Sequence, residues 1–327
     1  MNKLAKKSFQ VLLPFALGCF ILYWVYRDFD FSQVRNVLLN DVHWGWMAAS
    51  LVFGVLSHVF RGWRWKQTLE PLGEHPKSSN CVDAIFLSYA TNLVLPRVGE
   101  VSRCGVLAKY DNVSFGKSLG TVVTERLIDT LCIGVITGIT LLLQMPIFAT
   151  FFRETGTKIP SFSHLLHTPW FYVSLFCVIG FVWIIYRLLR MLSFFEKVKG
   201  FALNIWEGII SLKNVRNIPL FIFYTLAIWA CYYYHFYLTF FCFPFSEQLG
   251  CLAGLVMFVA GTVAVIVPTP NGAGPWHFAV ITMMMLYGVS ATDAAIFTLI
   301  VHGIQTLLVI LLGLWGWIHL QWSNKKT

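Results

Sequence analysis

One stretch of the sequence, from Gln248 to Thr292, runs for 45 residues without a Lys, Arg, Asp or Glu, yet helix breakers stand in its middle. A charge-free run of about 20 residues would cross a bilayer as one helix. The string VPTPNGAGP at 267–275 instead divides it into 17 residues (251–267) and 12 residues (276–287). The second piece reaches only about 18 Å, against a hydrocarbon core of about 30 Å. The pattern predicts a hairpin that enters the membrane and returns, a feature that lines substrate paths in transporters.

The composition of the whole chain is that of a membrane protein. Hydrophobic residues make up 57% and charged residues 12%, whereas soluble domains carry roughly 25% charged residues. We expect an all-α polytopic protein forming one integral membrane domain over 1–327. The sequence has no phosphate-binding P-loop, no nucleophile elbow and no metal-spaced cluster, so we expect no cofactor and no enzymatic activity. The net charge of +9 is better explained by topology than by nucleic acid, which we exclude as a partner.

Runs with few or no charges predict about six spanning helices and two re-entrant hairpins. The predicted spans are 9–26, 43–60, 118–145, 170–186, 218–243 and 293–320. The first predicted hairpin pairs 81–95 with 98–110 across Pro96 and Arg97; the second is the opening feature. The run at 9–26 lacks a cleavage site, so we expect a retained anchor. Apolar residues alternate with charges at 194–213, which predicts a helix lying in the membrane interface.

The distribution of positive charge predicts the orientation. With both hairpins returning to the side that they enter, 19 of the 24 Lys and Arg fall on one side and four on the other. Positive charge stays on the side of synthesis, so we expect both termini in the cytoplasm of a bacterial-type inner membrane.

The two hairpins predict an internal repeat. Each interrupts an apolar helix and stands between two spans, and the predicted topology makes them enter from opposite sides. Such inverted repeats place a substrate site at the membrane midplane. The alternative is that Pro and Gly recur in membrane helices without any repeat.

Three charged residues lie within the predicted span at 118–145: Glu125, Arg126 and Asp129. Each charge would cost roughly 2.5–3.5 kcal/mol near the centre of a membrane helix. Glu125 and Asp129 share one helical face, so they need partners or water. They either line a polar cavity, which we favour, or pair with each other near the membrane surface.

The tip of the first hairpin combines Arg97 with Gly99, which lets the chain turn. The helix that follows would point its N-terminal N–H groups inward, and an arginine beside such an end suits a phosphate. Glu100 and Arg103 follow three residues apart on one face, where they either join the headgroup site or form only an intrahelical ion pair. We expect Arg97, Glu100 and Arg103 to reach the depth of Glu125.

The tip of the second hairpin offers Asn271, Gly272 and Gly274, which allow close approach of the backbone to a ligand, and then His277. His277 either relays protons or binds phosphate, or it is a packed residue with a hydrogen-bond partner. The string RGWRW at 61–65 closes the second span, and its default interpretation is an anchor at the membrane interface.

Four strings resemble one known family in order and spacing: RGWRW at 61–65, NLVLPRVGEVSR at 92–103, ERLID at 125–129 and PTPNGAG at 268–274. The chain resembles the lysylphosphatidylglycerol synthase transmembrane-region family, flippase-like proteins that share a membrane domain with the multiple peptide resistance factor. The resemblance implies movement of a phospholipid or lipid-linked headgroup between leaflets. The 327 residues show no soluble aminoacyl-transfer domain, so we do not expect synthase activity to carry over. Relatives often carry an acidic residue after the second tip, where this chain has Trp276 and His277.

The sequence therefore predicts a translocator for an anionic phospholipid or a polyprenyl-phosphate-linked lipid. In this hypothesis Arg97, Arg103 and Arg126 hold phosphate, while Glu100, Glu125 and Asp129 hold the arginines or a cationic substituent. The alternatives are a membrane-embedded lipid transferase or an accessory subunit of a lipid or glycan synthase, and a scaffold that presents lipid. A lipid-modifying enzyme and a second copy of the chain stay open as protein partners.

Overall fold

The structure is a computed structural model, and it describes residues 3–27, 29–145 and 215–325. Every regular element in these ranges is a helix, so the all-α prediction is confirmed for them. The predicted span at 170–186 and the predicted interfacial helix at 194–213 lie outside the described residues.

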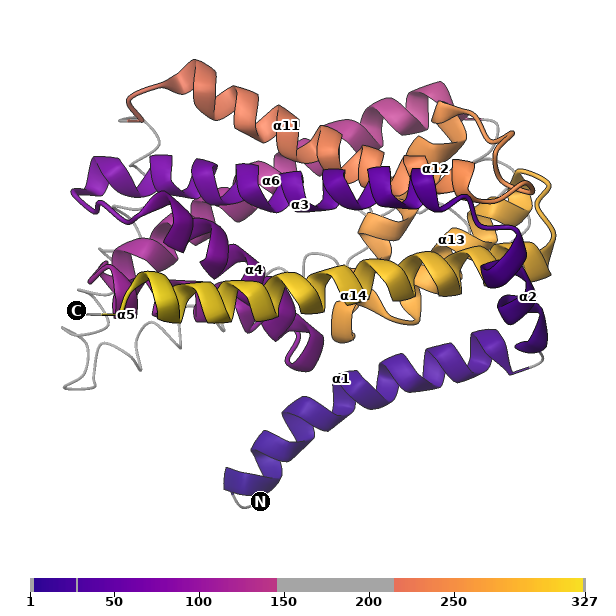
Figure 1. The fold of residues 1–327 in the computed structure, drawn as a ribbon, viewed down its shortest axis with the longest axis horizontal. Helices are drawn as coiled ribbons and strands as arrows, with labels where there is room; N and C mark the ends of the chain where they lie inside the picture. Colours follow the sequence, from indigo (N-terminus) through magenta and orange to yellow (C-terminus); the bar gives the residue numbers. More distant parts are fainter. Residues whose placement is uncertain (1–2, 28, 146–214, 326–327) are drawn as a thin grey trace, which may run out of the picture.

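The described elements up to residue 145 include a pair of helices broken at the first predicted hairpin tip (Figure 1). They are α1 (Lys3–Tyr26), α2 (Ser32–Asn40), α3 (Trp44–Leu69), a 3-10 turn (Glu70–Leu72), α4 (Ser78–Val94), α5 (Gly99–Tyr110) and α6 (Phe115–Leu143). Helix α4 ends where Pro96 forces Leu95 into an extended conformation (φ −130°, ψ 100°). Helix α2 was not predicted, because its segment was assigned to an outer loop.

The described elements after residue 214 repeat this plan. They are α11 (Ile218–Tyr237), a 3-10 turn (Leu238–Cys242), α12 (Cys251–Ala264), a 3-10 turn at the tip (Pro270–Gly272), α13 (Pro275–Leu286) and α14 (Ala291–Ser323). Helix α13 begins with Pro275, whose fixed φ and missing N–H suit the first turn of a helix. Both predicted hairpin breaks are thus confirmed within a few residues.

Corresponding helices of the two halves run in opposite directions. Helices α3 and α11 pack side by side, with the His43 N–H donating to Cys242 O at the start of α3. Arg64, near the end of α3, donates to Thr225 near the start of α11, so the two helices are antiparallel. The α4–α5 hairpin and the α12–α13 hairpin enter from opposite ends of the molecule (Figure 1). This is the order and direction predicted for an inverted repeat.

The hairpin tips meet near the middle of the molecule (Figure 1). Arg97 Nη2 of the first tip donates to Ile266 O beside the second tip at 2.8 Å. Each half also packs its hairpin against the last helix of the other half, since α4 packs on α14 and α12 packs on α6. Contact along α4 and α14 is close because Gly313 has no side chain, and a Cβ there would overlap Ala90 Cβ.

Long apolar surfaces face outward, as expected of helices in lipid. Helices α6 and α14 are each long and apolar enough to cross a bilayer, and α2 with the rod from Trp44 to Leu72, bent by 93°, would add a third span. Large apolar side chains on one face of α6 are exposed, namely Leu127, Leu131, Val135 and Leu142. The chain is a membrane protein; the total of about six spans and the orientation stay predictions.

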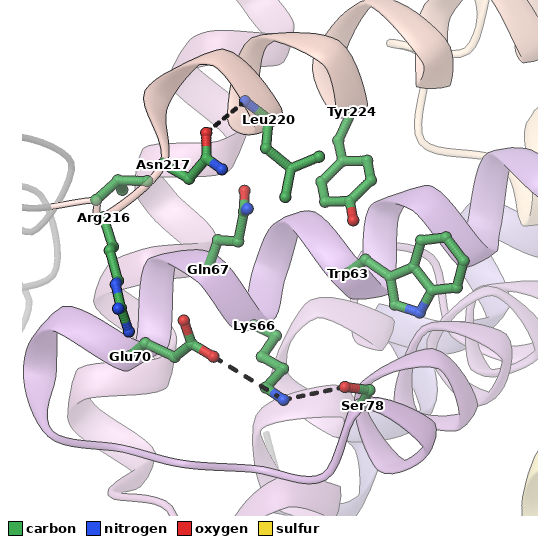
Figure 2. Close-up of a pocket in the computed structure, with 10 residues that line it drawn as sticks. Trp63, Lys66, Gln67, Glu70, Ser78, Arg216, Asn217, Leu220 and Tyr224 are labelled. Atoms are coloured by element: carbon green, nitrogen blue, oxygen red, sulfur yellow. Dashed lines mark hydrogen bonds and ion pairs between the residues drawn. The ribbon is translucent and has the colours of Figure 1, made fainter.

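A cavity of about 530 Å³ opens at the end of the molecule where α3 finishes and α11 begins (Figure 2). It lies beside Ser78, the first residue of α4, and is lined from α3 by Trp63 and Gln67 and from the start of α11 by Leu220 and Tyr224.

Candidate functional site

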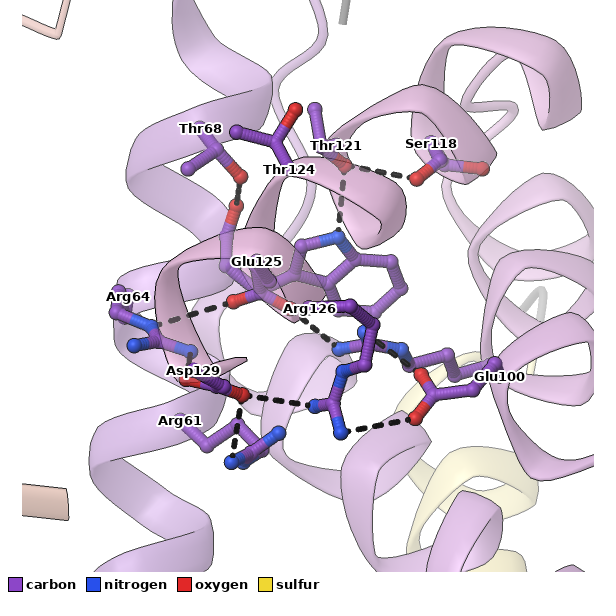
Figure 3. A network of polar contacts seen from close by, with 12 residues as sticks. Arg61, Arg64, Thr68, Glu100, Ser118, Thr121, Thr124, Glu125, Arg126 and Asp129 are labelled. Carbon is purple, nitrogen blue, oxygen red and sulfur yellow. Dashed lines mark hydrogen bonds and ion pairs between the residues drawn. The ribbon is translucent and has the colours of Figure 1, made fainter. Parts of the chain in front are cut away.

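The candidate site is a buried network of ion pairs centred on two carboxylates of α6. Glu125 is fully buried, and Asp129, one turn further along, is 8% exposed. The two side chains share a face, as their spacing predicted, and that face is turned toward α3 and α5 (Figure 3). Neither carboxylate is left alone, because arginines from two other helices reach them.

Helix α3 contributes Arg61 and Arg64. Arg64 is fully buried; its Nη2 lies 2.8 Å from Asp129 Oδ1 and its Nε lies 3.4 Å from Glu125 Oε1. Arg61 Nη2 lies 3.1 Å from Asp129 Oδ2. The interpretation of RGWRW as an interfacial anchor is therefore wrong for both arginines. They are one helical turn apart, so both face α6 and pair with its carboxylates.

Helix α5 contributes Arg103 and Glu100. Arg103 Nη1 lies 2.8 Å from Glu125 Oε2, and its Nη2 lies 2.9 Å from Glu100 Oε2 in the same helix. The Arg103 guanidinium also lies 4.6 Å from the ring centroid of Trp65, whose indole N–H donates to Thr121. Trp65 is fully buried, so it belongs to the site and not to the membrane interface. The predicted ion pair of Glu100 with Arg103 is confirmed, and so is their approach to Glu125.

Arg126 closes the network at its rim. It lies 3.3 Å from Glu100 and 3.2 Å from Asp129, and its side chain is 42% exposed (Figure 3). The network thus joins four arginines to three carboxylates, which leaves one positive charge in excess.

Arg61 has unused hydrogen-bonding capacity. Its side chain is 4% exposed, and its Nε and Nη1 are buried without a hydrogen-bond partner among the described residues. The rings of Tyr89 and Tyr232 lie 6.0 and 5.6 Å from its guanidinium carbon. Buried donors without an acceptor are costly. The chemistry that this arrangement offers is binding of an anion.

Arg97 does not contact the ion pairs of the network among the described residues, and its expected approach to the depth of Glu125 stays a prediction. It is exposed, its φ is +67°, and its hydrogen bond goes to the second tip. The N–H of Gly99, at the start of α5, already donates to Asn92 Oδ1 at 2.8 Å, so this N–H is not available to a phosphate. Asn92, which lay in a motif but received no role, fixes the shape of the tip.

The second tip is held by neutral groups. Asn271, Gly272 and Gly274 all have positive φ (51°, 71° and 93°). Asn271 Nδ2 donates to Thr306 at 2.8 Å, and its carbonyl oxygen lies 3.1 Å from His302 Nε2. His277 is buried, and its Nδ1 accepts the N–H of Gly274. His277 is thus packed and hydrogen-bonded, as in the second of the two alternatives given for it.

The residues that sequence reasoning missed are Arg61, Arg64 and Trp65. Their signal was two arginines at i,i+3 without an acidic residue within four positions in their helix, which requires partners elsewhere. Among the described residues no group of His, Cys, Asp or Glu is arranged to hold a metal ion.

Comparisons with known proteins agree with a membrane function. A family model described as the lysylphosphatidylglycerol synthase TM region matches residues 11–313. The glycosyltransferase AglD of Haloferax volcanii is 33% identical over 132 residues, which are 40% of this chain and 20% of that protein. The match thus spans about a fifth of the relative's length. No solved structure matches the chain.

Proposed function

Because the chain belongs to the lysylphosphatidylglycerol synthase TM region family, as its motifs predicted, we propose that it moves a lipid with an anionic phosphate headgroup between membrane leaflets. A membrane function related to lipids or glycans follows from the family and from the relative in Haloferax volcanii. Translocation is the finer statement that we propose, with no chemical change to the lipid.

The observation that carries the proposal is the contact of Arg97 with Ile266 where two oppositely directed hairpins meet. Arg97 is exposed there among exposed apolar side chains, including Val94, Val98 and Ile266. A guanidinium in such surroundings favours an anionic partner. Its fork fits two oxygens of one phosphate, which makes a phosphodiester headgroup a suitable partner.

The buried network supports the same ligand class. Glu100, in the first turn of α5, follows the Arg97 tip closely in the chain and pairs with Arg103 and Arg126. A headgroup that leaves the tip can therefore approach the network, where the excess positive charge and the free nitrogens of Arg61 favour an anion. In this proposal the contact of Arg97 with Ile266 separates when a headgroup passes between the tips.

The test is lipid movement in liposomes. Purified protein is reconstituted with a fluorescent phosphatidylglycerol, and a membrane-impermeant quencher reports the labelled lipid in each leaflet. We expect the wild type to accelerate exchange between leaflets without a co-substrate. Arg97→Lys keeps the charge but loses the fork, so exchange should fall about tenfold, which corresponds to about 1.4 kcal/mol.

The matched control is Arg35→Lys, because Arg35 is also exposed and lies on α2, away from the tips. Its exchange rate should equal that of the wild type. Equal rates for Arg97→Lys and the wild type would remove Arg97 as a headgroup ligand, and no acceleration by the wild type would remove the proposed function.

A second candidate is an accessory role in a lipid or glycan synthase. The observation in its favour is the similarity to a protein named a glycosyltransferase, of which the match covers only a fifth. Copurification with a lipid-modifying enzyme, together with lipid exchange only in its presence, would favour this function.

A further inference from the structure

We infer that the cavity between the end of α3 and the start of α11 is the site where a glycerophospholipid is loaded, with its phosphodiester in the cavity. The cavity has a volume of about 530 Å³ and a lining that is cationic on one side and aromatic on the other (Figure 2). The loading role rests on the proposed function, whereas the binding role can be measured without it.

The charged side of the cavity has one positive charge in excess. Lys66 and Arg216 face a single carboxylate, Glu70. Lys66 Nζ lies 3.9 Å from Glu70 Oε1, a long separation for an ion pair, and it donates to Ser78 Oγ at 3.0 Å. One excess charge matches the single negative charge of a phosphodiester.

The floor of the cavity holds a polar group without a partner. Gln67 Oε1 is buried and has no hydrogen-bond partner among the described residues. A buried acceptor of this kind costs free energy until a donor arrives. The glycerol hydroxyl of a lipid headgroup would supply that donor, and an inverted amide would offer N–H groups to the phosphate instead.

The other side of the cavity continues into an aromatic group of the kind found at membrane interfaces. Trp63 and Tyr224 line the cavity with ring centroids 5.9 Å apart, and Phe60 lies 6.0 Å from Tyr224. Phe223 beside them is 55% exposed, and Ile222 and Leu226 continue the exposed apolar surface along α11. The glycerol backbone and acyl chains of a lipid would lie against this surface, which a free phosphate compound would not use.

The cavity also adjoins the buried network. Arg64, on the same helix as Trp63 and Gln67, donates to Thr225 and lies 6.0 Å from the ring centroid of Phe221. The residues that line the cavity therefore alternate with residues that hold the network. A headgroup in the cavity would be separated from Arg64 only by side chains of α3 and α11.

The experiment compares a double variant in the cavity with a double variant of equal charge elsewhere. Lys66→Gln with Arg216→Gln removes both cations from the cavity. Lys109→Gln with Arg35→Gln removes two exposed cations away from it. Binding of short-chain phosphatidylglycerol to detergent-purified protein is titrated and followed by native mass spectrometry, with glycerol 3-phosphate in a second arm.

We expect the cavity variant to bind phosphatidylglycerol at least about tenfold more weakly than the wild type, and the control to stay within about twofold. These comparisons require that each variant unfolds at the same temperature as the wild type. Arg216 is exposed, so its substitution should have little effect on stability. Trp63→Ala should also weaken lipid binding, without changing any charge. Unchanged lipid binding in the cavity variant would overturn the proposal, and so would glycerol 3-phosphate binding as strongly as the lipid.

Lipid exchange between leaflets is measured on the same proteins. Weak binding together with slow exchange in the cavity variant would support the loading site. Normal exchange with unchanged lipid binding would overturn the loading site and leave the proposed function standing. A wild type that binds lipid in the cavity but exchanges none would overturn the proposed function and the loading role together.

Discussion

The α3–α6 half and the α11–α14 half each place a hairpin against long helices, in opposite directions, but different groups hold their inner faces. In the first half, four arginines and three carboxylates connect α3, α5 and α6. In the second half, His277 and His302 pack with ring centroids 4.5 Å apart, and Asn271 donates to Thr306. The α12–α13 hairpin contains no Lys, Arg, Asp or Glu.

The difference indicates what the charges are for. The α12–α13 hairpin is built without Lys, Arg, Asp or Glu, so charge is not needed to hold such a hairpin in place. Buried ion pairs are often no more stabilising than apolar residues of the same volume. The ion pairs of the first half are therefore in keeping with the proposed role in binding an anion.

The largest expected effect is loss of stability on breaking the network. Arg64→Ala leaves Glu125 and Asp129 each without one of their cations, and should cost roughly 3–5 kcal/mol in the free energy of unfolding. His302→Ala in the second half loses neutral contacts and should cost roughly 1–3 kcal/mol. Unfolding in a denaturing detergent measures the cost of each substitution. Equal costs would contradict the expected difference between the charged half and the neutral half.

The next effect is steric and concerns the two tips. A Cβ on Gly99 would overlap the carbonyl oxygen of Ser88, so Gly99→Ala should cost about 1–3 kcal/mol. Gly105 in the same helix has no neighbour within 4 Å of such a Cβ, so Gly105→Ala should be neutral or stabilising. Gly274→Ala in the second tip should also destabilise, because its φ is +93°. Thermal unfolding of the three variants measures these differences in stability. A Gly99→Ala variant as stable as Gly105→Ala would contradict the prediction.

A smaller effect is expected at the rim of the network. Arg126 pairs with Glu100 and Asp129 as Arg64 pairs with its partners, but its side chain is 42% exposed. Solvent weakens exposed ion pairs, so Arg126→Ala should cost about 1 kcal/mol or less. The same unfolding measurement on Arg126→Ala and Arg64→Ala tests whether burial sets the difference. If Arg126→Ala cost as much as Arg64→Ala, Arg126 would have to lie in surroundings of low dielectric constant despite its exposure.

The sequence predicted the parts of the fold and site that depend on neighbours in the chain. Pro96 follows the end of α4 and Pro270 lies at the tip after α12, where a proline cannot continue a helix, and Glu100 with Arg103 form an ion pair across one helical turn. Arg61 and Arg64 could not be assigned in this way, because their carboxylates lie about sixty residues further along. The same arginines beside tryptophans fit a membrane anchor equally well, and only the packing of α3 on α6 separates the two interpretations.

The smallest expected effect on stability concerns two residues with positive φ, one at each tip. The same two residues also test whether the charged half and the neutral half differ in function. Arg97 has φ +67° and Asn271 has φ +51°, a conformation that costs roughly 1–2 kcal/mol for most residues and little for glycine. Arg97→Gly relieves that cost but loses the hydrogen bond to Ile266, so the free energy of unfolding should change by less than about 1 kcal/mol. Asn271→Gly loses its hydrogen bond to Thr306 and should change by a similar amount.

The two variants should differ in lipid movement. If charge in the first half serves the headgroup, Arg97→Gly folds normally and loses most of the lipid exchange between leaflets, whereas Asn271→Gly keeps most of it. The presence of an arginine at position 97, where the backbone conformation favours glycine, would then be explained by the function of its guanidinium. Loss of exchange in a well-folded Asn271→Gly would show that the second tip also contacts the lipid, as the sequence predicted for Asn271. Normal exchange in Arg97→Gly would move the search for the headgroup ligand to Arg61, whose free nitrogens lie within the buried network.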